Sequence, residues 1–150
     1  MHTNKIMTAE IQKSLDQLIG KEISKVWRGY GATIFLELGK LSKDPKGDLK
    51  GESCIMIEWS WRVENKRSIL FGSFSTDRKI DNQLQKLTGK TIKTIRITGR
   101  LPEIEIELEN NQWIHSFQTS EGQPDWCIFM ADRYFAVERG IIKTIFYERK

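Results

Sequence analysis

An internal repeat constrains the fold of this chain more than any other feature. Residues 18–26 (LIGKEISKV) align with residues 87–95 (LTGKTIKTI) at an offset of 69, and Leu, Gly, Lys and Ile are identical in register. After a turn that is one residue longer in the second copy, residues 34–38 align with residues 104–108. Agreement over two consecutive segments predicts the tandem duplication of one structural unit.

Each copy is expected to open with a short helix. Apolar residues recur at helical spacing before both motifs, at Ile11, Leu15, Leu18 and Ile19 and again at Leu84 and Leu87. Thr8 and Asp81 are the expected N-caps, because their side-chain oxygens can accept a backbone N–H of the first turn. Gly20 and Gly89 suit the left-handed position at which a helix ends. The repeated glycine therefore has a structural explanation that needs no ligand.

Short alternating or apolar runs predict strands through the rest of the chain. They lie at about residues 22–28, 32–38, 53–62, 67–74, 91–98, 103–109, 112–118, 126–131, 134–138 and 141–147. The last two are joined only by Arg139-Gly140, so they are expected to form an antiparallel hairpin at about 134–148. We expect a single mainly β domain over residues 1–150, an antiparallel sandwich or curled barrel made of two tandem helix-plus-β-meander repeats, at about 8–75 and 81–131.

Composition indicates a globular chain. Hydrophobic residues make up 39% and charged residues 29%, which is too apolar for disorder and too polar for a membrane protein. The net charge of +4 permits only weak attraction to polyanions. No stretch reads as a signal peptide or a membrane span, so we expect a cytoplasmic protein. Cys54 and Cys127 lie in apolar runs without metal-ligand spacing and are expected to be buried reduced thiols, with no metal or cofactor.

A lysine-rich insertion is the main difference between the two copies. It spans residues 39–51, contains four lysines and is expected to be a loop, which is where recognition commonly resides. Residues 27–31 (WRGYG) form a second candidate contact, because the two glycines leave Tyr30 uncovered. These features predict a non-enzymatic domain that binds and occludes another protein, with homo-oligomerisation through a sheet edge left open. The expected contacts are Trp27, Arg28, Tyr30, Lys43, Lys46 and Lys50.

A nucleic-acid-binding β module is the alternative interpretation. Tryptophans on a sheet can stack on bases where basic residues border them. Arg62, Lys66 and Arg67 follow Trp61 and supply such a pattern, so Arg62 and Arg67 complete the candidate binding residues. Packing of the tryptophans in the core competes with this interpretation.

A small enzyme is the further alternative. The sequence contains no phosphate-binding loop, nucleophile elbow or His-Glu-x-x-His motif, and we predict no catalytic residue. His115 aligns with Ile57, so it is expected to point inward as a hydrogen-bonded, partly buried histidine. The alternating glutamates of residues 103–109 are interpreted as a solvated charge ladder opposite the basic residues of the preceding strand. The titratable groups left for an enzyme are Glu37, Glu58, His115 and Asp125.

The repeated motif also resembles a known group of proteins. The Leu-x-Gly-Lys-x-Ile-x-x-Ile opening, the alternating strand after it and the late tryptophan of residues 123–126 (QPDW) resemble small uncharacterised bacterial proteins with a duplicated L-x-G-x-x-V β unit, over about residues 18–131. Some members of that group resemble immunity proteins that neutralise toxins from neighbouring cells. The resemblance implies an immunity-type inhibitor as one form of the binding function, and it implies no catalytic residue.

Overall fold

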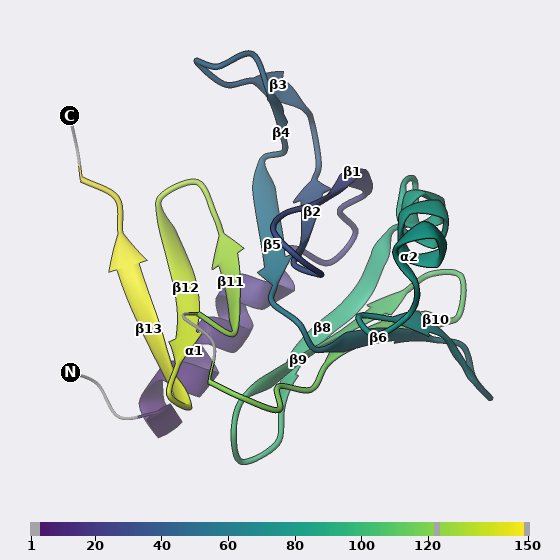
Figure 1. Ribbon diagram of the computed structural model, residues 1–150. Coiled ribbons are helices and arrows are strands. Elements are labelled where there is room, and N and C mark those ends of the chain that lie inside the picture. Colours follow the sequence, from purple (N-terminus) through teal and green to yellow (C-terminus); the bar gives the residue numbers. More distant parts are fainter. Residues whose placement is uncertain (1–3, 122–123, 149–150) are drawn as a thin grey trace.

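The computed structural model describes residues 4–121 and 124–148 (Figure 1). The first three residues and Gln123 of the QPDW segment therefore lie outside the described residues. The elements are α1 (Asn4–Asp16), β1 (Ile23–Arg28), β2 (Ile34–Leu38), β3 (Ser42–Lys43), β4 (Leu49–Lys50), β5 (Ser53–Ile57), β6 (Trp61–Glu64), β7 (Ile69–Gly72), α2 (Asp77–Leu84), the 3₁₀ helix η1 (Gln85–Leu87), β8 (Ile92–Thr98), β9 (Glu103–Leu108), β10 (Gln112–Ser116), β11 (Trp126–Phe129), β12 (Arg133–Glu138) and β13 (Ile141–Phe146).

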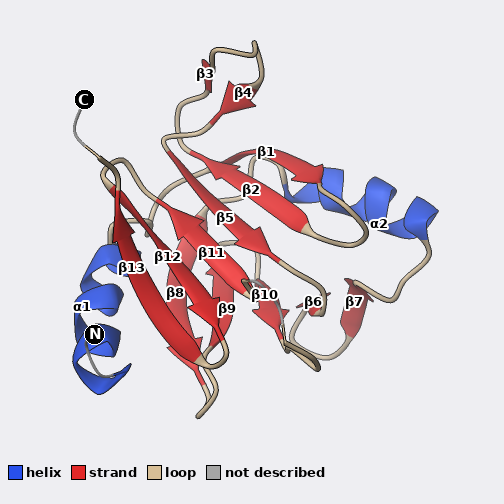
Figure 2. Cartoon of the chain, turned by 60° about the vertical axis from the view of Figure 1, so that its left-hand side comes forward, coloured by secondary structure: helices blue, strands red, loops and turns tan. Residues whose placement is uncertain are grey.

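The strands form two antiparallel sheets and one small hairpin. The larger sheet has the order β1-β2-β5-β11-β12-β13, the other has the order β7-β6-β10-β9-β8, and β3 pairs with β4. The chain crosses from the first sheet to the second between β5 and β6, and it returns between β10 and β11 (Figure 2). Each sheet therefore contains strands from both halves of the sequence. The mainly β, antiparallel prediction is confirmed, and among the described strands neither sheet closes into a barrel.

One continuous hydrophobic core joins both sheets and both helices. Strand alternation directs residues into it, as in β9, where Ile104, Ile106 and Leu108 are buried and the intervening glutamates are half-buried on the other face. Helix α1 contacts β8 and β13 at one side of the core. Helix α2 and η1 contact β7 and β1 at the other side. No described helix has the length and apolar character needed to cross a membrane.

The two copies of the repeated motif hydrogen-bond to each other. The N–H of Gly20 donates to the carbonyl of Ile92 at 2.8 Å, and the N–H of Gly89 donates to the carbonyl of Ile23 at 2.7 Å. Between these bonds, Ile23 donates to Lys90 at 2.8 Å and Ile92 donates to Lys21 at 2.9 Å. The contacts are reciprocal under the offset of 69 found in the sequence, so the motif links the start of β1 to the start of β8.

Two buried tryptophans make matching contacts after the chain has crossed between the sheets. The indole N–H of Trp61 donates to the carbonyl of Ala32 at 2.7 Å, in the β1–β2 turn. The indole N–H of Trp126 donates to the carbonyl of Pro102 at 3.1 Å, in the β8–β9 turn. A buried indole needs such a partner. Each tryptophan therefore ties the strand that follows a crossing to a turn of the sheet that the chain has just left.

Several local expectations were wrong. Helix α1 begins at Asn4, so Thr8 lies inside it, and the N-cap of α2 is Thr76, so Asp81 also lies inside a helix. The strand expected at 53–62 is interrupted between β5 and β6, because the chain changes sheets there. The insertion at 39–51 is not a plain loop, since β3 and β4 make it a short β-hairpin, which we call the lysine hairpin.

The orientation of β10 also differs from the expectation. Ile55 faces Leu36 across β2 and β5, whereas Ile114 faces Ile106 across β9 and β10, so Ile114 takes the position that the sequence alignment gave to Trp113, one residue away. A slip of one residue exchanges the two faces of a strand. His115 is accordingly half-exposed, and Ser116 is the buried residue.

Replacing either motif glycine by alanine should destabilise the fold by about 1 kcal/mol, because both residues have left-handed φ values, 86° at Gly20 and 91° at Gly89. No side chain or backbone atom would collide with the new Cβ at either position, so backbone strain alone sets the effect. Urea unfolding of Gly20→Ala and Gly89→Ala measures it. Asparagine at the same positions should recover part of the loss, and unchanged midpoints in both alanine variants would contradict this explanation.

Candidate functional site

The face of the larger sheet that points away from the core carries a second apolar cluster. Met56, Cys127 and Ala136 are buried at its centre although they are not part of the main core. Larger side chains, Phe35, Phe129, Tyr134 and Ile145, pack around them. Beside this cluster, at the base of the lysine hairpin, lies a pocket of about 370 Å³, which we call the aromatic pocket. Its lining includes Trp27, Phe35, Glu37, Lys50, Gly51, Glu52, Ser53, Cys54, Phe129, Met130 and Tyr147.

Trp27 is held in place by three contacts in this pocket. It faces Phe35 across β1 and β2, and the two rings stack with centroids 3.8 Å apart and planes inclined by 5°. Phe35 covers one face of the indole. The Nζ atom of Lys50 lies over the ring, 4.4 Å from its centroid, and therefore on the other face. The indole N–H donates to the Oε2 atom of Glu37 at 2.8 Å. The tryptophan is therefore half-buried and rigidly positioned, not a free exposed ring.

Glu37 connects the strands to the lysine hairpin. Only 1% of its surface is exposed. Its Oε1 atom accepts the N–H of Gly51 at 3.0 Å, and its Oε2 atom accepts both the indole N–H of Trp27 and the thiol of Cys54, the latter at 3.4 Å. Both carboxylate oxygens thus have donors, as a buried charged group requires. The residue positions Trp27 and the end of the hairpin relative to each other.

The two cysteines are free and lie on this outer face. Burial raises the pKa of the Cys54 thiol far above its ordinary value, and the nearby Glu37 carboxylate raises it further. Burial raises the pKa of Cys127 to about 12, with a further contribution from Glu138. Both thiols are therefore protonated at neutral pH, and a protonated thiol is a poor nucleophile. Cys127 is buried as expected, whereas Cys54 is only partly buried.

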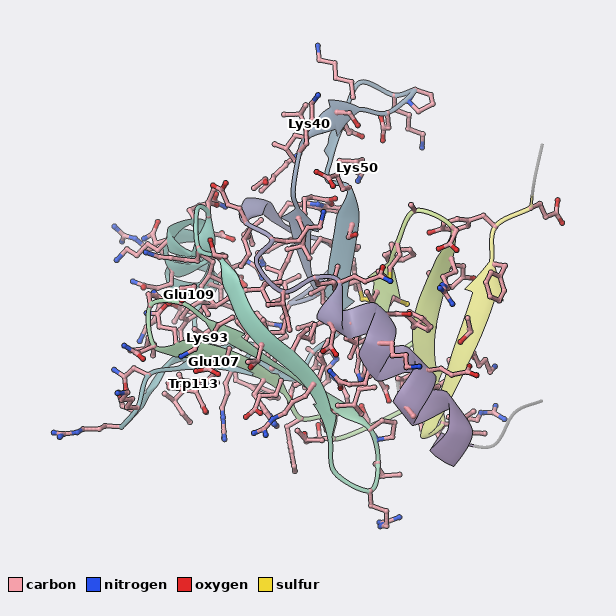
Figure 3. All side chains as sticks on the ribbon, turned by 180° about the vertical axis from the view of Figure 1, so that it is seen from behind. Lys40, Lys50, Lys93, Glu107, Glu109 and Trp113 are labelled. Carbon is pink, nitrogen blue, oxygen red and sulfur yellow. The ribbon has the colours of Figure 1, made fainter. Side chains whose placement is uncertain are left out.

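The lysine hairpin presents cations without carboxylate partners. Among the described residues, no carboxylate lies within ion-pair distance of the side chains of Lys40, Lys43, Lys46 and Lys50. Asp44 is occupied, because its Oδ1 atom accepts the backbone N–H groups of residues 46 and 48. Glu52 accepts the Lys21 ammonium at 2.7 Å, which lowers its pKa, and the backbone N–H of residue 40. Figure 3 shows Lys40 and Lys50 on this hairpin, far from the labelled residues of the other sheet.

The structure separates the remaining predicted contact residues from this pocket. Tyr30 is 99% exposed at the β1–β2 turn, the opposite end of β2 from the lysine hairpin. Arg28, also predicted as a contact residue, has partners within the chain. Its guanidinium donates to Asp77 and Asp81 at 2.9 Å each, ties α2 to β1, and has its pKa raised by both carboxylates.

The outer face of the smaller sheet carries mixed charge. Arg62 pairs with Glu64 at 2.9 Å, Lys93 with Glu107 at 3.7 Å, and Arg96 with Glu105. The predicted charge ladder of β9 is present at Glu105 and Glu107, and Figure 3 shows Lys93 beside Glu107 on this sheet. Glu103 instead accepts hydrogen bonds from the hydroxyl of Ser116 and the N–H of residue 118. Arg67 lies exposed in the β6–β7 turn. A surface with so many carboxylates does not favour binding to nucleic acid.

The tryptophans divide between core and surface. Trp61 and Trp126 are buried as core packing predicts, whereas Trp59 is 42% exposed and contacts Phe74 edge-on. Trp27 and Trp113 are half-buried on the outer faces of different sheets.

The four titratable groups considered for an enzyme do not share one pocket, although Glu58 and Asp125 are neighbours, since the N–H of Glu58 donates to the carbonyl of Asp125 at 3.0 Å. Glu37, Asp125 and His115 line three different pockets. Glu58 accepts a hydrogen bond from Thr33, and His115 lies 3.5 Å from the hydroxyl of Thr98. Within the described part of the chain no three His, Cys, Asp or Glu side chains form a group that could hold a metal ion.

Phe35, Phe129 and Tyr147 line the pocket but were not among the predicted contact residues. Phe35 was recognisable in principle, because Trp27 and Phe35 stand at matching distances from the turn of a short hairpin and so face each other. Phe129, in β11, and Tyr147, directly after β13, reach the pocket from parts of the chain distant in the sequence, which no local pattern indicates. No family model, no curated protein and no solved structure matches this chain.

The folded protein should react slowly with iodoacetamide at pH 8. Free cysteine has a pKa of about 8.5, so raised thiol pKa values should lower the alkylation rate at least about a hundredfold. The rate should increase as the pH rises toward the thiol pKa values. Mass spectrometry of the folded and the urea-unfolded protein measures this, and rapid alkylation of Cys54 in the folded protein would contradict the assignment.

Glu37→Gln should destabilise the fold by about 1–3 kcal/mol, because the new NH₂ group must face the N–H of Trp27 or of Gly51 and leaves that buried donor without an acceptor. Urea unfolding gives the stability, and near-UV circular dichroism reports the packing of Trp27. Glu52→Gln is the matched control, since Glu52 is exposed on the same hairpin, and it should change stability much less. Equal effects of the two substitutions would argue against the role of Glu37.

Proposed function

We propose that this chain is a non-enzymatic binding domain that recognises another protein through the aromatic pocket and the lysine hairpin. The observation that carries the proposal is the fixed position of Trp27 between Phe35 and Lys50 at an open pocket. Aromatic side chains contribute a large share of the energy at protein interfaces. A side chain that is already immobile loses little entropy on binding, so its contact area is available at low cost.

Comparison with the other sheet supports a functional reason for the aromatic pair. The sequence alignment places Arg96 and Glu105 opposite Trp27 and Phe35, and Arg96 and Glu105 also face each other across neighbouring strands. There the fold uses an ion pair. Since the same strand geometry accepts either pair, stability of the sheet alone does not call for a stacked Trp and Phe at an open pocket.

The chemistry of the pocket favours binding over catalysis. The Glu37 carboxylate is saturated with donors inside the fold, and the Cys54 thiol is protonated at neutral pH. Neither group is poised to transfer a proton to a ligand or to attack one. The proposal therefore includes no catalytic residue and no cofactor.

An immunity-type inhibitor that covers the active surface of a toxin is the specific form that we favour, and it extends the resemblance noted in the sequence. A cytoplasmic location and an origin of the two halves by tandem duplication belong to the same proposal. The reciprocal bonds between the two motifs and the matching tryptophan contacts are what support the duplication.

Capture of a partner from lysate of the source cells tests the binding function. The tagged protein should retain one protein at equal stoichiometry after nuclease treatment, identified by mass spectrometry. Trp27→Leu should weaken this complex at least about thirtyfold, the effect of a typical interface hot spot. Trp113→Leu, which alters a half-buried tryptophan on the other sheet, is the control and should bind normally.

Two results would contradict the proposal. Retention of nucleic acid that Lys66→Glu abolishes would favour the nucleic-acid-binding module. Equal loss of the partner in Trp27→Leu and Trp113→Leu would place the contact outside the aromatic pocket.

A further inference from the structure

The aromatic pocket and the lysine hairpin together define the chemistry of the partner. We infer that the partner presents an acidic segment with one large apolar side chain, which fills the aromatic pocket while neighbouring carboxylates pair with the hairpin lysines. This inference rests on the proposed function, because it concerns the same surface.

Unpaired cations on the hairpin argue for carboxylates on the partner. Lys43 precedes the hairpin turn, Lys46 lies within it, and Lys50 lies where the hairpin returns to the sheet. Two of the nearby acidic residues are engaged within the chain, Asp44 by backbone N–H groups and Glu52 by Lys21, whereas Asp48 is exposed in the turn. The four lysines of the hairpin still outnumber its two aspartates, so a partner can supply the remaining negative charge, and complementary charges at an interface raise the association rate and fix its orientation.

Apolar walls on two sides of the pocket argue for an apolar anchor. One wall consists of Trp27 from β1 and Phe35 from β2. The other consists of Phe129 from β11, Met130 directly after β11, and Tyr147 directly after β13. The pocket, with a volume of about 370 Å³, has room for one large side chain. Pockets that receive such an anchor are where interface energy concentrates.

Lys50 joins the two parts of the surface. Its ammonium group lies over Trp27 and can keep this cation–π contact while it donates to a carboxylate, because an ammonium has three N–H donors. A partner side chain in the pocket would also exclude water from that ion pair and strengthen it. An acidic residue next to the apolar anchor therefore fits the surface best.

The same surface suits a protein segment better than a nucleic acid. Phe35 and Lys50 cover the two faces of Trp27, so a base cannot stack on it. The hairpin turn also carries Asp44 and Asp48 between its lysines, which leaves a modest positive charge instead of a basic track.

Selection from random peptides displayed on phage, with the full chain as target, tests this inference. Binders should be enriched in Asp and Glu around one aromatic or large aliphatic residue. Affinity of a synthetic copy of the best binder should fall at least about tenfold for the Lys43→Glu/Lys46→Glu variant. It should be unchanged for Lys66→Glu, an exposed lysine on the other sheet's β6–β7 turn. A peptide with its acidic residues replaced by lysine should bind the charge-reversed variant better than the original peptide does.

Other outcomes overturn the inference. The inference is wrong if the selected peptides are neutral or basic, or if the library yields no binder. It is also wrong if acidic peptides bind with an affinity that neither the Lys43→Glu/Lys46→Glu variant nor Trp27→Leu changes. Preferential binding of single-stranded nucleic acid to the hairpin would overturn it as well. If lysate capture still yields a stoichiometric protein that depends on Trp27, the binding function stands and only the acidic segment is wrong, so the two failures are distinguishable.

Discussion

The reciprocal hydrogen bonds between the two Leu-x-Gly-Lys motifs are the contact on which the rest of the structure depends. They place the start of β1 beside the start of β8, where Glu22 and Thr91 also form an isolated bridge. From this junction one sheet continues outward from β1 and the other from β8. Helices α1 and η1 lead directly into the two motifs, so the same bonds determine where the helices cover the core. A glycine in each motif makes the sharp change of direction possible.

This junction leaves the outer faces of the two sheets free to differ. The inner faces share one core and must complement each other in volume. On the outside, the aligned pairs diverge into the Trp27–Phe35 stack on one sheet and the Arg96–Glu105 ion pair on the other. The lysine hairpin follows β2, whereas β9, the strand aligned with β2, is followed directly by β10. The pocket beside the hairpin therefore lies on the outer face of the larger sheet.

The parts of the fold that were predictable are those set by local chemistry. Alternation in β9 indicated the buried and solvated faces, and Arg139-Gly140 indicated the last hairpin, where both residues adopt positive φ values. The exchange of strands between sheets was not predictable, because it depends on contacts such as that of Trp126 with Pro102 across distant sequence. Because of the insertion, the sequence alignment after it was shifted by one residue, so His115 was predicted on the wrong face of β10. Of the predicted contact residues, Trp27 and Lys50 contact each other. Arg28 instead forms ion pairs with two aspartates of α2, and only the packing of that helix brings them close to it.

Gly51 shows how closely the pocket and the hairpin are coupled. A Cβ atom at this position would collide with the backbone of Leu38. The chain that returns from the hairpin can therefore lie this close to β2 only if residue 51 is glycine. That approach brings the Gly51 N–H to the buried Glu37 carboxylate, which also holds the indole of Trp27. Movement of the hairpin would therefore break a hydrogen bond to the residue that orients the tryptophan. Lys50 directly precedes Gly51, so the same backbone contact also positions the Lys50 ammonium over the indole of Trp27. The charge of the hairpin and the apolar pocket are thus linked at the base of the hairpin, through Gly51, Glu37 and Lys50.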